Sequence, residues 1–290
     1  GGFLAVCWTD FVQGFMMLIS LMVVPVFAIS MMGGPEQTVE ILNGLGTNFL
    51  NPLYDNGEPL NFISILSQLS WALGYFGMPH ILVRFMAIKN ESEVRKSRKI
   101  AITWVVISLS VACLLGAIGR AFFIDAPLDN AENVFVDMIG KVFTDNLHIP
   151  FIGGLLLCGI LAAIMSTADS QLLVTASSIS EDVYKGVIRK NASEKSMLWV
   201  SRITVLAVSI VAFIIALDPN SSVMGLVSNA WAGFGATFGP VVLLGLFWRR
   251  SNRIGAAAGM IGGGLMVILW DYIPLGSATL ADYTGVYSFL

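Results

Sequence analysis

The residues that could do chemistry are concentrated in one segment, Leu161 to Ser170, which reads LAAIMSTADS. Four polar residues interrupt a stretch that is otherwise apolar from Ile149 onward: Ser166, Thr167, Asp169 and Ser170. Polar side chains inside a membrane helix avoid lipid and face protein or water. Oxygen atoms are the ligands that a hard cation such as Na⁺ prefers. The chemistry these residues indicate is therefore ion binding.

The spacing places most of these oxygen atoms on one helix face. Ala163, Ser166, Thr167 and Ser170 stand at i, i+3, i+4 and i+7, which are positions on a single stripe. A small residue in the stripe lets another helix approach closely. This stripe could bind an ion such as Na⁺ through its hydroxyls and exposed backbone carbonyls, whereas Asp169 lies on another face. The alternative is that the hydroxyls only bond back to carbonyls of their own helix or join two helices.

A second segment, Ser70 to His80, reads SWALGYFGMPH and is poor material for an unbroken helix. Gly74, Gly77 and Pro79 favour a break. Pro79 removes an amide donor and disfavours helical geometry at Met78, so backbone carbonyls could line a cavity at mid-membrane depth.

Aromatic residues surround the expected break. Trp71, Tyr75 and Phe76 could close over a small solute, and with Pro79 they form the candidate substrate site or gate. The alternative is a proline kink with packed aromatic rings. Asp10, near the cytoplasmic start of an apolar segment, could guide a leaving cation or cap that helix.

The composition indicates a membrane protein. The chain is 56% hydrophobic and 12% charged, with a mean hydropathy of +0.79, which a globular surface does not tolerate. A net charge of −3 gives no basic nucleic-acid surface, and the sequence has no phosphate loop or metal-spaced Cys/His set. We therefore expect no catalytic residues, no cofactor and no nucleic-acid partner.

Seven segments are long enough to cross a bilayer, which needs about 20 apolar residues per helix. They run over residues 11–32, 62–86, 100–124, 149–177, 197–217, 223–248 and 254–273. Basic residues gather in alternate connections, after the second, fourth and sixth segments, which places these connections in the cytoplasm. The sequence thus predicts an all-α, multi-pass protein in which Gly1 lies inside and the seventh span ends outside near Asp271.

The external connections carry two further expectations. Residues 33–61 are rich in Gly, Asn and Pro, which predicts an ordered but irregular segment. Residues 131–143 have apolar side chains at helical spacing, Val134, Met138 and Val142, which predicts a short amphipathic helix. It could lie over the external mouth, or it could be a surface helix with no role in gating. Within the membrane, the small residues of 230–240 and the glycines at 255, 259 and 263 predict close helix packing.

Five segments together carry a family resemblance. They read GGFLAVCWTDFVQG at 1–14, WALGYFGMPHILVRFMA at 71–87, LAAIMSTADSQLLV at 161–174, ISEDVYK at 179–185 and LVSNAWAGFGATFGPVVLLGLFW at 226–248. The chain resembles the sodium:solute symporter family, and within it the sodium/proline symporters. This resemblance implies a leucine-transporter-like fold of five-plus-five inverted repeats. Residues 1–290 would be one transporter domain that lacks the N-terminal core helices.

The resemblance also implies roles for individual residues. In the family, Na⁺ is bound by a carbonyl and two hydroxyls that match Ala163, Ser166 and Thr167, with the remaining ligands on the absent first core helix. An acidic residue on the sodium exit path matches Asp10.

The substrate side of the resemblance concerns the expected break. An aromatic pair and a proline important for substrate match Trp71, Tyr75 and Pro79, with Tyr75 positioned like the inner gate. Met78 departs from the pattern of the nearest proline transporters, which are expected to carry Gln at this position. The resemblance therefore does not determine the exact substrate.

The resemblance leads us to expect sodium-coupled uptake of a small solute, with L-proline the leading candidate, in a plasma membrane such as the bacterial inner membrane. Symport of a sugar or pantothenate is an alternative. Another is a transporter-like sensory domain of a membrane histidine kinase.

Overall fold

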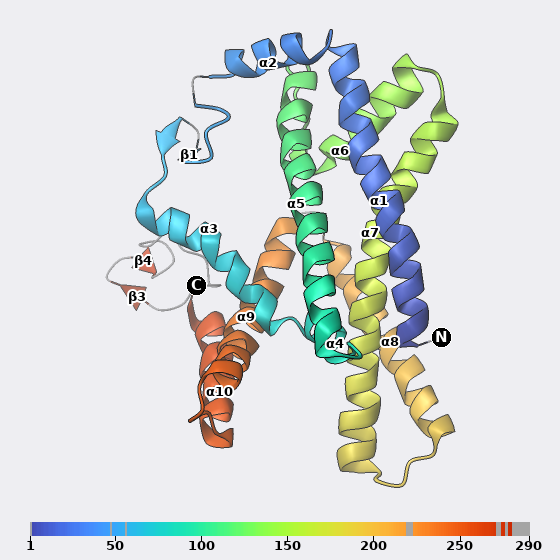
Figure 1. Ribbon diagram of the computed structural model, residues 1–290, viewed down its shortest axis with the longest axis vertical. Coiled ribbons are helices and arrows are strands. Elements are labelled where there is room, and N and C mark those ends of the chain that lie inside the picture. Colours follow the sequence, from blue (N-terminus) through green and yellow to red (C-terminus); the bar gives the residue numbers. More distant parts are fainter. Residues whose placement is uncertain are drawn as a thin grey trace. The chain divides into compact units, whose positions relative to one another are not determined.

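The computed structural model describes residues 2–46, 48–55, 57–218, 223–270, 274–275 and 278–279. Most of them lie in helices, as Figure 1 shows. The chain divides into two compact units. One contains Gly1–Glu58 and Lys89–Val205, and the other contains Pro59–Ile88 and Leu206–Leu290.

Every expected apolar segment is helical in its described part. The helices are α1 (Phe3–Met31), α3 (Phe62–Gly74) with α4 (Pro79–Met86), α5 (Glu91–Phe122), α7 (Pro150–Ser177), α8 (Glu194–Ala216), α9 (Val223–Phe247) and α10 (Arg253–Leu269). By length and composition, five helices of the described chain could cross a membrane: α1, α5, α8, α9 and α7 with its π-helical extension η4 (Ser178–Ile188). The expected end of the last span near Asp271 lies outside the described residues.

The first unit is built on the packing of α1 against α7, which run antiparallel side by side (Figure 1). Gly159 of α7 makes this approach possible, because a Cβ there would meet the Ser20 side chain and the Met16 carbonyl. α5 packs on α1, where the Trp104 ring faces Gly14. The pair α1 and α7 therefore fixes where the polar stripe of α7 lies.

The expected short helix over residues 131–143 is confirmed. It consists of η2 (Ala131–Asn133), α6 (Val134–Ile139) and a π-helical turn η3 (Gly140–Asn146). Met138 and Val142 are fully buried, and with Phe143 they join the core between α1, α5 and α7. This segment is thus a core element of the first unit.

The expectation of an irregular segment over residues 33–61 is partly wrong. It contains the helix α2 (Pro35–Gly44) and two short strands, β1 (Tyr54–Asp55) and β2 (Glu58–Pro59). Pro35 at the first helical position and Glu36 in the first turn both favour a helix start. The buried side chains Thr38 and Leu42 then hold α2 in place.

The second unit contains α3, the 3₁₀ turn η1 (Tyr75–Gly77), α4, α9 and α10, with a hairpin of β3 (Pro274–Leu275) and β4 (Ala278–Thr279). The expected packing role of the glycines is seen at α10. A Cβ on Gly263 would collide with the Ala236 carbonyl of α9, and one on Gly259 would approach Val241 at 3.2 Å. Glycine thus lets α9 and α10 lie in backbone contact.

Candidate functional site

The hydroxyl groups of the α7 stripe converge on one carbonyl oxygen. Ser166 Oγ donates to the Ala163 carbonyl at 3.0 Å, and Thr167 Oγ1 donates to the same oxygen at 3.2 Å. The structure therefore brings oxygen atoms of the three predicted ligands close together. Such back-bonds also occur without a site, as Thr175 shows on the same helix, so convergence on one oxygen is what distinguishes the stripe.

The stripe is closed on one side and open on the other. Ser170 is buried against α1, and its hydroxyl donates to the Ser166 carbonyl at 2.8 Å and to Asp10 Oδ2 at 3.4 Å. Ser166 is half-buried, whereas Thr167 is exposed in this chain. The predicted exit-path residue Asp10 thus lies one helical turn from the candidate ligand Ser166, joined to it through Ser170.

The predicted helix break is confirmed. α3 ends at Gly74, η1 follows, and Met78 adopts an extended backbone with φ −79° and ψ 111° before α4 begins at Pro79. Pro79 occupies the first helical position, where its missing N–H costs no hydrogen bond. Tyr75 and Phe76 project from the turn with 50% and 40% of their surface exposed.

Trp231 of α9 holds the broken span. Its indole N–H donates to the Trp71 carbonyl at 3.0 Å, and its ring meets Tyr75 edge-on with centroids 4.9 Å apart. Gly74 leaves room for this indole, because a Cβ there would collide with it. Trp231 therefore connects two of the three aromatic residues predicted to receive substrate, Trp71 and Tyr75.

Comparison of the sequence with models of known protein families identifies the family of this chain. The model of the sodium:solute symporter family matches residues 1–263 of the 290. The chain belongs to the sodium:solute symporter family. It is accordingly a multi-pass plasma-membrane protein, in agreement with its five membrane-length apolar helices among the described residues.

The names of several curated relatives describe them as proline symporters or proline transporters. The chain is 46% identical over 276 residues to the sodium/proline symporter of Escherichia coli K12, covering 93% of this chain and 53% of that protein. It is 45% identical over 285 residues to the high-affinity proline transporter PutP of Bacillus subtilis, covering 98% and 57%. It is 42% identical over 292 residues to the osmoregulated proline transporter OpuE of the same species, covering 100% and 56%. The chain thus spans about half the length of the relatives it matches.

Two groups of predicted site residues belong to different units of this symporter-family chain. Ala163, Ser166, Thr167 and Asp10 lie in the first unit, and the aromatic residues with Pro79 lie in the second. The local pattern around Trp231 predicts close packing and does not indicate its contact with Trp71, although a lone indole donor among small residues is a usable signal.

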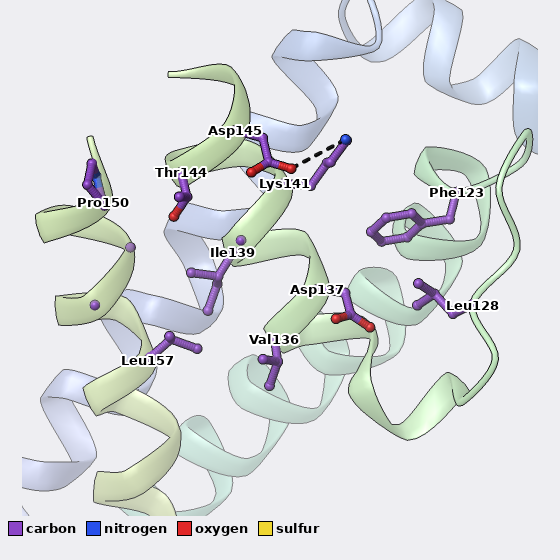
Figure 2. A pocket seen from close by; sticks show the side chains of 13 residues that line it. Phe123, Leu128, Val136, Asp137, Ile139, Lys141, Thr144, Asp145, Pro150 and Leu157 are labelled. Atoms are coloured by element: carbon purple, nitrogen blue, oxygen red, sulfur yellow. Dashed lines mark hydrogen bonds and ion pairs between the residues drawn. The ribbon is translucent and has the colours of Figure 1, made fainter. Parts of the chain in front are cut away.

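A cavity of about 610 Å³ lies within the first unit, between η3, the start of α7 and the segment after α5 (Figure 2). Figure 2 shows Lys141 and Asp145 at its edge, paired at 3.4 Å. Both side chains are more than half exposed, so this pair contributes little stability. No predicted site residue lines this cavity.

Proposed function

We propose that the complete protein couples the inward movement of Na⁺ to the uptake of a small solute, with L-proline the leading candidate. The observation that carries the proposal is the convergence of two hydroxyls on the Ala163 carbonyl in a chain of this family. The names of the three curated relatives support proline as the solute.

The proposed architecture is a single transporter domain with seven transmembrane helices. They form the C-terminal part of a five-plus-five inverted repeat, in which α3, η1 and α4 make one broken span. The basic connections after the second, fourth and sixth spans support a topology with Gly1 in the cytoplasm. Broken helices at mid-membrane depth are typical of transporter substrate sites.

Sodium acts through differential binding to two conformations. The α7 stripe supplies three oxygen ligands, and a helix of the family fold outside this sequence supplies the rest. An ion that bridges the two helices stabilises only the conformation in which they lie close together. That conformation presents the broken span to the external solute, and after closure Na⁺ leaves past Asp10.

The solute is received at the break. Trp71, Tyr75 and Phe76 supply apolar faces that suit a pyrrolidine ring, and the irregular backbone around Pro79 supplies polar groups. Tyr75 stands at the turn itself, where a small backbone rotation moves its ring, so it acts as the gate.

The test is uptake of labelled proline by proteoliposomes that contain the full-length protein. We expect concentrative uptake with an inward Na⁺ gradient and none with a K⁺ gradient of equal size. Unlabelled sugars and pantothenate, added in excess, should leave the signal unchanged. Uptake that ignores Na⁺, or inhibition by those other solutes, would contradict the proposed function.

A further inference from the structure

We propose that the side-chain amide oxygen of Gln13 is a further sodium ligand, which holds the ion in transit between the α7 stripe and Asp10. The inference rests on the proposed function, because it requires that Ala163, Ser166 and Thr167 bind sodium first.

The amide oxygen of Gln13 is buried and has no hydrogen-bond partner among the residues the structure describes. Buried polar atoms are nearly always paired, because an unpaired one costs free energy of desolvation. Helix packing alone does not explain why a buried position carries an unpaired amide oxygen. Transient binding of an ion would explain it.

The register of α1 against α7 places Gln13 beside the stripe. Asp10 contacts Ser170, and further along the antiparallel pair Ser20 and the Met16 carbonyl lie against Gly159. Gln13 lies one turn beyond Asp10 toward Ser20, on the same helix face. It therefore stands opposite the turn of α7 that contains Ser166.

The hydroxyl groups of the α7 stripe already donate hydrogen bonds to other atoms. Ser166 and Thr167 donate to the Ala163 carbonyl, and Ser170 donates to the Ser166 carbonyl and to Asp10. The stripe thus presents acceptor oxygens and has no hydroxyl donor left for Gln13. A group of acceptor oxygens without a free hydroxyl donor suits a cation.

A neutral amide is suited to transit. The ion must bind well enough to enter each position and weakly enough to leave it. An amide oxygen lowers the cost of the step between the stripe and the Asp10 carboxylate without adding a second negative charge that would hold the ion.

The experiment compares two modes of transport by the full-length protein in proteoliposomes. Net proline uptake into a sodium-free lumen requires release of Na⁺ in every cycle, whereas proline exchange with high Na⁺ on both sides does not. Gln13→Met keeps the length of the side chain and removes the oxygen. We expect its net uptake to fall about tenfold, with exchange within about twofold of the unmodified protein.

Thr9→Val is the matched control, because Thr9 lies one turn before Gln13 on α1 and its hydroxyl is satisfied by the Ala5 and Val6 carbonyls. It should leave both rates unchanged. Equal loss of net uptake and exchange in Gln13→Met would assign Gln13 to structure and overturn the inference, as would no loss in either. If the unmodified protein shows no sodium-coupled uptake, the proposed function itself fails, which the same assay reveals separately.

Discussion

The indole N–H of Trp231 donates a hydrogen bond of 3.0 Å to the carbonyl oxygen of Trp71, one turn before the break in the second expected span. Helix α9 thereby satisfies a backbone group of the broken helix and sets the position of Tyr75 through ring contact. Trp231 thus connects α9 to the proposed aromatic gate.

Trp231→Phe should weaken solute binding while leaving sodium binding intact. The change keeps an aromatic ring and removes the donor, at a cost of about 0.5–1.5 kcal/mol, which corresponds to about a two- to tenfold rise in the KM for proline. The measurement is proline uptake at saturating Na⁺. Trp199→Phe, on an exposed face of α8, is the control, and an equal rise in that variant would remove the special role of Trp231.

Tyr75→Ala should also raise the KM for proline, by at least about threefold, because the ring contact with Trp231 and the apolar face are both lost. The Na⁺ concentration for half-maximal uptake should not change. Equilibrium binding of labelled proline checks this. Normal proline affinity at normal expression would return Tyr75 to a packing role.

Gly77→Ala should destabilise the second unit. A Cβ at this position would collide with the Phe234 carbonyl, which is backbone and cannot move aside as a side chain does. Overpacking of this kind costs about 1–3 kcal/mol. Thermal unfolding in detergent should show a lower Tm for Gly77→Ala. The control Gly233→Ala, with no atom near the new Cβ, should leave the Tm unchanged.

Phe143→Ala should destabilise the first unit most strongly among the substitutions considered. Phe143 is fully buried and its ring lies 5.2 Å from that of Phe27. Removing a core ring costs about 3–5 kcal/mol. Phe151→Ala, at a position 82% exposed, is the control for the same Tm measurement. A Tm equal to that of the control would mean that the η3 turn is not part of the core.

Local chemistry made much of this fold predictable. Gly74, Gly77 and Pro79 act on their own backbone, so the break could be located from the sequence, and the period of apolar residues identified Met138 and Val142. The helix α2 was missed although Pro35 and Glu36 favour a helix start, because the Gly, Asn and Pro content of the surrounding segment dominated the prediction.

The partners of the site were less predictable, because they depend on which helices meet and in what register. The convergence of Ser166 and Thr167 on Ala163 follows from helix geometry alone. The contact of Asp10 with Ser170, and that of Trp231 with Trp71, each join residues 160 positions apart. No local pattern fixes such a register, so Gln13 and Trp231 emerged only from the structure.

The central claim is that the α7 stripe binds sodium, and Thr167→Val tests it most directly. Valine keeps the shape and removes one ligand oxygen, so the Na⁺ concentration for half-maximal proline uptake should rise about tenfold, as expected for the loss of a contact to a charge. Thr175→Val removes a hydroxyl that is bonded back in the same way on the same helix, and it should change nothing. An unchanged sodium dependence in Thr167→Val, with normal expression and proline affinity, would contradict the account.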